Sequence, residues 1–154
     1  SPLRQLKVSQ YLEKGEPWPS PRFTDNSNGT VTDDLTGLIW LKNGNCYGLR
    51  IWLDALDDCN ALAHGSCGLT DSSAAGDWRL PNIRELQSLI DYSISSPALP
   101  SGHPFTGVQT TTYWSNTSHG IDITYSWCTN IDNGSAFYNN IALTNYVWPV
   151  RSGQ

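Results

Sequence analysis

The sequence predicts an α+β fold in which two helices pack on a mainly antiparallel sheet. Two segments, residues 51–63 and 83–90, place apolar side chains at helical spacing. Short segments rich in β-branched and aromatic residues flank them and are separated by turn residues, a pattern typical of antiparallel strands. With 154 residues, the chain is long enough for one domain with a substantial hydrophobic core.

The N-terminal stretch, residues 1–21, is expected to be a lead-in rather than part of the domain. Its Pro17, Pro19 and Pro21 exclude a central strand, since proline cannot donate to a sheet ladder. The domain is then expected to span residues 22–154. Because the chain begins at Ser1 and contains no Met, we expect it to be a piece excised from a longer chain.

The first elements of the domain are predicted to be strands. Residues 23–25 and 30–32 flank an Asn-Ser-Asn-Gly sequence, which is typical of a hairpin turn. Residues 38–41, Leu-Ile-Trp-Leu, form a short apolar run after a Thr-Gly pair and predict a buried strand.

Two helices are predicted next, each with its own boundary signals. Gly65 is expected to end the first helix, because glycine readily adopts the left-handed conformation of a helix C-cap. Asn82 follows Pro81 and precedes Glu85 by three residues, so the two predict a capping box at the start of the second helix.

The C-terminal part predicts further strands, with an Asp-Asn-Gly hairpin turn at residues 132–134. Alternation around this turn places Trp127, Thr129 and Ile131 on one face and Cys128, Asn130 and Asp132 on the other. We expect Trp127 and Trp148 to be core residues. The segments expected to be strands are residues 113–115, 125–131, 135–141 and 146–150.

Charge and cysteine content limit the classes of function. The formal net charge is -5 and no basic cluster is present, so we expect no nucleic-acid partner. No apolar run is long enough to span a membrane, so we expect no direct membrane insertion. The four cysteines lack the paired spacing of a zinc site and favour disulfides in an oxidising compartment, although four reduced core cysteines remain an alternative.

One disulfide is predicted from the chain itself. Cys46 and Cys67 bracket the first predicted helix, and the loop they would close ends in glycine-rich coil. Closing a loop of about 20 residues would stabilise the fold by roughly 3 kcal/mol in the chain-entropy model.

Five motifs resemble one bacterial family. They are Pro-Arg-Phe-Thr-Asp-Asn at residues 21–26, Gly-Thr-Val-Thr-Asp at 29–33, Leu-Thr-Gly-Leu-Ile-Trp at 35–40, Gly-Asp-Trp-Arg-Leu-Pro-Asn at 76–82 and Tyr-Val-Trp-Pro-Val-Arg at 146–151. They resemble the Lcl C-terminal domain family, named after a bacterial collagen-like adhesin, over about residues 18–153. The resemblance implies a C-type lectin-like fold, similar to the variable proteins of diversity-generating retroelements.

The resemblance also implies a second disulfide, Cys59–Cys128, since lectin-like domains often link their first helix to a late strand. It implies secretion or display at the cell surface. Diversity-generating retroelements rewrite adenines in the 3′ part of a target gene, so it further implies a variable ligand-binding face late in the chain.

The composition of residues 115–147 bears on that variable face. Randomising the adenines of an Asn codon cannot produce Lys, Glu, Gln, Met or Trp, and this stretch lacks the first four and holds one Trp, Trp127. A low-charge antiparallel sheet would also be poor in Lys and Glu, so this alternative stays open. The stretch is rich in Tyr, Ser, Asn and Gly, as binding loops are. The candidate contact residues are His119, Asp122, Tyr125, Phe137, Tyr138, Asn140, Ile141 and Leu143.

No catalytic motif is found, and the expected function is non-catalytic recognition of a protein or glycan ligand on another cell or phage host. A fixed-specificity glycan-binding adhesin is the first alternative, and a lectin-fold enzyme or a self-assembly module is the second, so an oligomer stays possible. We expect no cofactor and no metal site. Calcium is a weaker possibility at residues 25–34, where oxygens cluster but the spacing favours a hairpin turn.

Arg79 lies between Trp78 and Leu80 at the start of the second helix. It is expected to be a structural residue that needs a carboxylate partner if it is buried.

Overall fold

The computed structural model describes residues 18–153. The predicted lead-in therefore lies mostly outside the described residues. Its described part, residues 18–21, forms no helix or strand, and the ring of Trp18 lies 4.5 Å from the Arg22 guanidinium.

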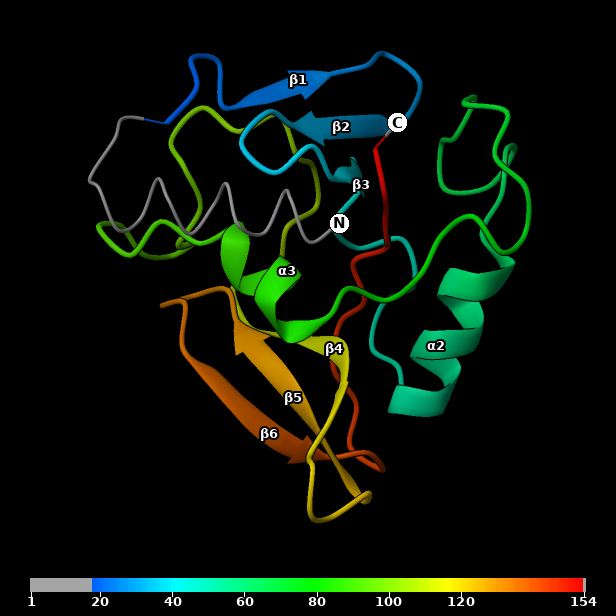
Figure 1. The fold of residues 1–154 in the computed structure, drawn as a ribbon, viewed down its shortest axis with the longest axis vertical. Coiled ribbons are helices and arrows are strands. Elements are labelled where there is room, and N and C mark those ends of the chain that lie inside the picture. Colours follow the sequence, from blue (N-terminus) through cyan, green and yellow to red (C-terminus); the bar gives the residue numbers. More distant parts are fainter. Residues whose placement is uncertain (1–17, 154) are drawn as a thin grey trace.

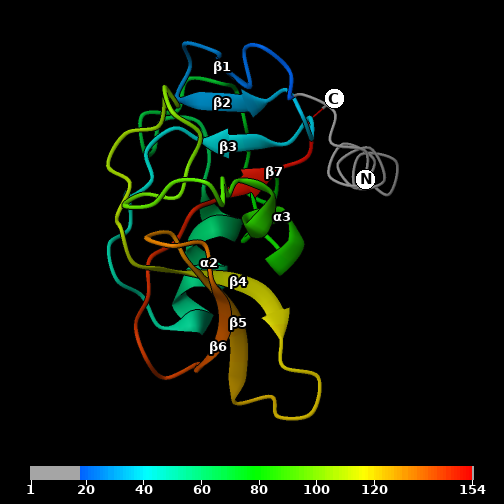
Figure 2. The same cartoon turned by 90° about the vertical axis from the view of Figure 1, so that its left-hand side faces the viewer.

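Within the described residues, two helices and two antiparallel sheets form a mixed α+β structure, which confirms the predicted class (Figure 1). The four-stranded sheet lies at one end of the molecule and the three-stranded sheet at the other, with α3 between them and α2 alongside (Figures 1 and 2). The helices are α2, Trp52–Ala61, and α3, Ile83–Ser88.

The four-stranded sheet has the order β1-β2-β3-β7. Its strands are β1, Phe23–Asp25; β2, Thr30–Asp33; β3, Ile39–Leu41; and β7, Val150–Arg151. The C-terminal strand pairs antiparallel with β3, so the beginning and the end of the domain share one sheet. The strand predicted at residues 146–150 is thus divided: Tyr146 makes an isolated bridge to Tyr113, and only Val150 of this range, together with Arg151, pairs with β3.

The three-stranded sheet has the order β4-β5-β6 and forms two hairpins. Its strands are β4, Thr112–Ser118; β5, Tyr125–Asn130; and β6, Ala136–Asn140. The predicted Asp-Asn-Gly turn connects β5 to β6. β4 pairs with β5 through a register shift between Trp114 and Ser118.

The predicted β1–β2 hairpin is confirmed and is closed by side chains in its own turn. The Asp25 carboxylate accepts a hydrogen bond from the Ser27 N–H, and Asn28 accepts one from the Thr30 N–H. Gly29 adopts a φ of 86°, and a Cβ there would lie 2.5 Å from the carbonyl oxygen of Gly68. Only glycine fits this position, because both the backbone angle and the contact exclude a side chain.

The second helix begins as predicted. The Asn82 side chain accepts the Glu85 N–H, and the Glu85 carboxylate accepts the Asn82 N–H, which completes a capping box. The first helix is shorter than its pattern, because Leu62 turns to an extended conformation and closes the helix three residues before Gly65.

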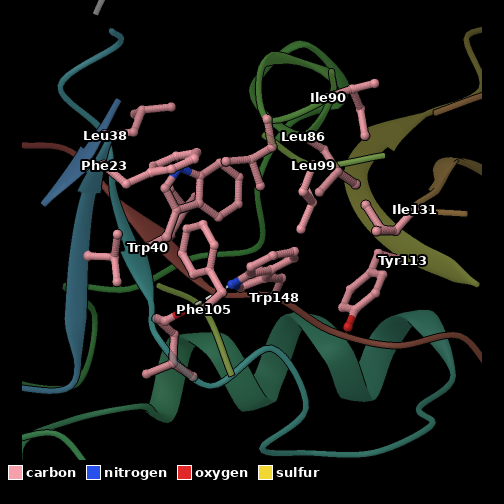
Figure 3. Packing of buried hydrophobic residues seen from close by; sticks show 14 of the residues in the cluster. Phe23, Leu38, Trp40, Leu86, Ile90, Leu99, Phe105, Tyr113, Ile131 and Trp148 are labelled. Atoms are coloured by element: carbon pink, nitrogen blue, oxygen red, sulfur yellow. Dashed lines mark hydrogen bonds between the residues drawn. The ribbon is translucent and has the colours of Figure 1, made fainter. Parts of the chain in front are cut away.

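Aromatic side chains dominate the main core. Phe105 packs edge-on against Phe23 at 5.1 Å and against Trp148 at 4.8 Å between ring centroids. Trp148 also contacts Trp40 and donates its indole N–H to the Leu41 carbonyl oxygen at 2.8 Å. Figure 3 shows these rings between the four-stranded sheet on one side and Leu86 of α3 and Tyr113 of β4 on the other. Trp148 is fully buried, which confirms its predicted place.

A second, smaller core lies between α2 and the three-stranded sheet. It consists of Ala55, Cys59, Leu80, Trp114, Cys128 and Val147. The Trp114 indole donates to the Arg50 carbonyl oxygen, and the Trp52 indole to the Ser115 carbonyl oxygen, at 2.7 and 2.8 Å. Both bonds attach the N-terminal end of α2 to β4.

The predicted Cys46–Cys67 disulfide is formed. It closes a loop that contains α2, and both sulfur-bearing residues pack against the main core. The bond lies next to the β1–β2 hairpin, because Gly29 of the hairpin approaches Gly68, the residue that follows Cys67.

Candidate functional site

Four aromatic or imidazole side chains gather on one face of the three-stranded sheet. We call them the aromatic row: His119, Tyr125, Trp127 and Tyr138. Trp127 and Tyr138 are direct cross-strand partners, with ring centroids 5.4 Å apart. The Tyr138 ring also lies 4.5 Å from the His119 ring and 5.7 Å from the Tyr125 ring. Tyr138, at the centre, is 48% exposed, and the other three are partly exposed.

Strand alternation explains why these rings share a face. Tyr113, Thr129 and Ile131 point to this same side of the sheet and are buried, and Gln87 of α3 donates to the Thr129 hydroxyl at 2.8 Å. The main core ends there, and Trp127 continues the face as a partly exposed residue. Trp127 was expected in the core, and that prediction is wrong because the face extends beyond the core that covers its neighbours.

Two buried serine hydroxyls hold β5, the strand that carries Tyr125 and Trp127 of the aromatic row, against β4. The Ser115 hydroxyl donates to the Trp127 carbonyl oxygen at 2.7 Å. The Ser126 hydroxyl bonds to the carbonyl oxygens of Ser115 and Thr117 across the irregular part of the β4–β5 pairing. Both serines are buried, so these bonds fix the backbone that carries the row.

The loop of residues 119–124 is closed by its own polar groups. The Asp122 N–H donates to Nδ1 of His119 at 3.2 Å. The Asp122 carboxylate accepts the Thr124 hydroxyl at 2.6 Å and the Thr124 N–H at 3.0 Å, and these bonds lower the pKa of Asp122. The carboxylate is therefore ionised at neutral pH, on the solvent side of the loop.

A second loop, residues 140–145, lies against the first. The Ile141 N–H donates to the Thr124 carbonyl oxygen at 2.9 Å and joins the two loops. The Asn140 side chain accepts the Ala142 N–H, so Asn140 shapes this turn. Leu143 projects from it and is 53% exposed.

The structure brings most of the predicted contact residues together, but not Phe137. His119, Tyr125 and Tyr138 belong to the aromatic row, and Asn140 is the cross-strand partner of Tyr125. Asp122, Ile141 and Leu143 lie on the two adjoining loops. Phe137 pairs with Cys128 on the opposite face and packs against the second core, so it is a structural residue.

In this region, sequence reasoning misassigned one partly exposed residue and missed two exposed ones. Trp127 was assigned to the core, and Ile121 and Ile123 were not named as contacts. The two isoleucines are 94% and 81% exposed, more than any other large hydrophobic residue described. The sequence could have indicated their exposure, because both flank the charged Asp122 in the short loop that connects β4 to β5.

The predicted Cys59–Cys128 disulfide is not formed, and both cysteines are free, buried thiols. Burial raises the pKa of both, that of Cys128 to about 12, so both thiols stay protonated at neutral pH. The Cys128 sulfur lies 3.5 Å from the Ser126 carbonyl oxygen and 3.9 Å from the Asn145 amide nitrogen instead.

The oxygens considered for calcium have other partners. Asp25 binds Lys42 at 2.8 Å, Asp33 forms a buried ion pair with Arg22, and Asp34 accepts the Thr24 hydroxyl. No group of three or more His, Cys, Asp or Glu residues in residues 18–153 is placed to hold a metal ion.

Arg79, expected to need a carboxylate partner if buried, is partly exposed and pairs with Glu85. Its guanidinium makes two bonds to Glu85, at 2.5 and 2.6 Å, and the Glu85 carboxylate raises the pKa of Arg79. Arg79 also borders an open cleft of about 490 Å³, lined by Gly76, Asp77, Arg79, Arg151 and Ser152.

By class, the molecule is a disulfide-bonded α+β domain with a partly exposed aromatic face. The chain belongs to the Lcl C-terminal domain family, whose profile matches residues 29–151. Comparison with curated proteins gives no match. The disulfide is consistent with an extracytoplasmic location. None of the helices described is long and apolar enough to cross a membrane.

Proposed function

We propose that this chain is a non-catalytic ligand-binding domain of a bacterial surface protein, and that it binds through the aromatic row and the two adjoining loops. The observation that carries the proposal is Tyr138, which contacts three rings and is still 48% exposed. A soluble domain rarely gathers large rings at its surface without a partner for them.

The chemistry of the row suits recognition. Tyrosine and tryptophan offer large, rigid contact areas at low entropic cost, and their polar atoms can still form hydrogen bonds. Three of the four residues of the row, Tyr125, Trp127 and Tyr138, lie on paired strands, which hold a site more exactly than free loops do. The loops beside it add Asn140 and Leu143, which supply polar and apolar contacts.

In its finer form, the proposal is that the domain has a C-type lectin-like fold and is the variable protein of a diversity-generating retroelement. In support, the row and both loops fall within residues 115–147, the stretch that contains no Lys, Glu, Gln or Met. An adenine-rich near-repeat of the coding region beside a reverse transcriptase gene is expected. Its absence from the complete genome would contradict diversification but not ligand binding.

A fixed-specificity glycan-binding adhesin is the second candidate. Trp127 favours it, because adenine randomisation of an Asn codon does not produce Trp, and yet Trp127 belongs to the row and contacts its central residue, Tyr138. At least one central residue of the face is therefore fixed even under diversification.

A binding experiment tests the proposal. The variant Trp127→Ser/Tyr138→Ser is compared with the wild type on a glycan array and on whole bacterial cells. The variant Leu53→Ser is the matched control, because Leu53 is 56% exposed on α2, outside the row. We expect the row variant to lose binding while it still unfolds cooperatively, at a Tm only a few degrees below that of the control. Binding that survives in the folded row variant would contradict the proposal.

A further inference from the structure

Two aliphatic side chains form an exposed apolar tip beside the aromatic row. They are Ile121 and Ile123, which are 94% and 81% exposed. Both come from the loop of residues 119–124, which begins at His119 of the aromatic row. The loop after β4 forms the end of the molecule farthest from the four-stranded sheet (Figures 1 and 2).

The loop that carries the two isoleucines has a defined shape. Asp122 bonds to His119 through its N–H and to Thr124 through its carboxylate. These bonds use the polar groups of the loop internally and leave the isoleucines on either side without cover among the described residues. Exposed aliphatic side chains grouped in this way mark an interaction surface.

We propose that the apolar tip contacts a protein partner whose surface offers an apolar pocket next to a Lys or Arg side chain. This inference rests on the proposed function, because the tip adjoins the aromatic row and extends it. The charge of the tip supports it. Asp122 lies between the two isoleucines, its pKa is lowered, and Asp132 is the only other formally charged residue between positions 92 and 150. A cation on the partner would complement this single carboxylate.

A lipid membrane fits the tip less well. A single myristoyl chain gives only marginal membrane binding, and the two isoleucines offer less apolar surface than that chain. Insertion would also bring the Asp122 carboxylate into the interface. Residues 92–150 contain no Lys or Arg that could attract anionic lipids.

A second copy of the chain also fits less well. A two-fold contact through the tip would use the same surface on both copies. It would place the two Asp122 carboxylates near each other, and like charges in a contact oppose association.

The test selects binders to the wild-type domain from a library of disulfide-cyclised random peptides. Binding is then compared among four proteins: the wild type, the tip variant Ile121→Ser/Ile123→Ser, the row variant Trp127→Ser/Tyr138→Ser and the control Leu53→Ser. Thermal melts check that each variant is folded. Because the replaced tip side chains are exposed, the tip variant is expected to melt as the control does.

The expected result is a set of peptides that combine apolar residues with Lys or Arg. They should bind the tip variant about tenfold or more weakly than the control. Binding should also weaken with salt and in Asp122→Asn.

Peptides that bind the tip variant as tightly as the control would overturn the inference, and so would failure to select any tip-dependent peptide. If the selected peptides bind the tip variant normally but bind the row variant more weakly than the control, the proposed function stands and only the inference fails. If their binding depends on neither surface, both fail.

Tip-dependent sedimentation with phosphatidylcholine or phosphatidylglycerol vesicles, in the absence of tip-dependent peptides, would assign the tip to lipid. Tip-dependent dimerisation in analytical ultracentrifugation would assign it to a second copy.

Discussion

Removing the Arg79 guanidinium tests whether the ion pair at the start of α3 is structural. The Glu85 side chain is 6% exposed and the Arg79 side chain 37%. In Arg79→Ala the Glu85 carboxylate stays buried and loses its cation. It still accepts the hydrogen bond that the Asn82 N–H donates at 2.9 Å. A buried charge without its counterion strongly disfavours the folded state.

The expected loss follows from the burial of the two partners. Breaking a fully buried ion pair costs about 3–5 kcal/mol. Because 37% of the Arg79 side chain is exposed, water screens the pair and can reach the vacated space, and the loss is discounted to about 2 kcal/mol. For a domain of this size, 1 kcal/mol shifts the Tm by roughly 2–4 °C, so a fall of about 4–8 °C is expected.

The assay is differential scanning calorimetry of the wild type, Arg79→Ala, Glu85→Gln and the double variant. A double-mutant cycle isolates the coupling between the two side chains. We expect the double variant to melt above Arg79→Ala, because a neutral amide removes the unpaired buried charge. An unchanged Tm in Arg79→Ala, combined with lost ligand binding, would refute the reasoning and assign Arg79 to a site at the cleft it borders.

Three further outcomes are expected. In urea denaturation, Trp148→Ala should lose about 3–5 kcal/mol of unfolding free energy and Trp127→Ala about 1 kcal/mol, and equal losses would contradict the assignment of Trp127 to the surface. Gly29→Ala should lose roughly 2 kcal/mol because of its positive φ and the facing carbonyl oxygen, whereas Gly120→Ala, with open space around it, should melt like the wild type. Burial raises the pKa of the Cys128 thiol to about 12, so the folded state keeps a proton that the unfolded state releases first. Stability should therefore fall as pH rises from about 9 toward 12, and in Cys128→Ala this fall should be shallower, which urea midpoints across that range would show.

Features that depend on neighbouring residues were predictable from the sequence. The Asn82–Glu85 capping box, the β1–β2 hairpin and the turn at residues 132–134 all formed as predicted. In each case a few adjacent residues satisfy one another's backbone groups, and this chemistry is the same in any fold. The Cys46–Cys67 bond belongs here too, since it closes a single loop around one helix.

Features that depend on what covers a face were not predictable in the same way. Alternation correctly grouped Trp127 with Thr129 and Ile131, but it could not show that the core ends beside Thr129 and leaves Trp127 partly exposed. Phe137 illustrates the reverse error, because its neighbours in sequence are exposed while its own side chain packs against the second core.

The sequence by itself determined the α+β class, the main turns and helix starts, one disulfide, the family and the stretch of chain that carries the candidate site. Only the tertiary structure decided the order of the four-stranded sheet, the free state of Cys59 and Cys128, and which side chains of the C-terminal strands are exposed. The physical reason is that local hydrogen bonds are formed by residues close in sequence. Burial is decided by elements far away in the chain, and the side chains of Ile121 and Ile123 lie where none of the described elements covers them.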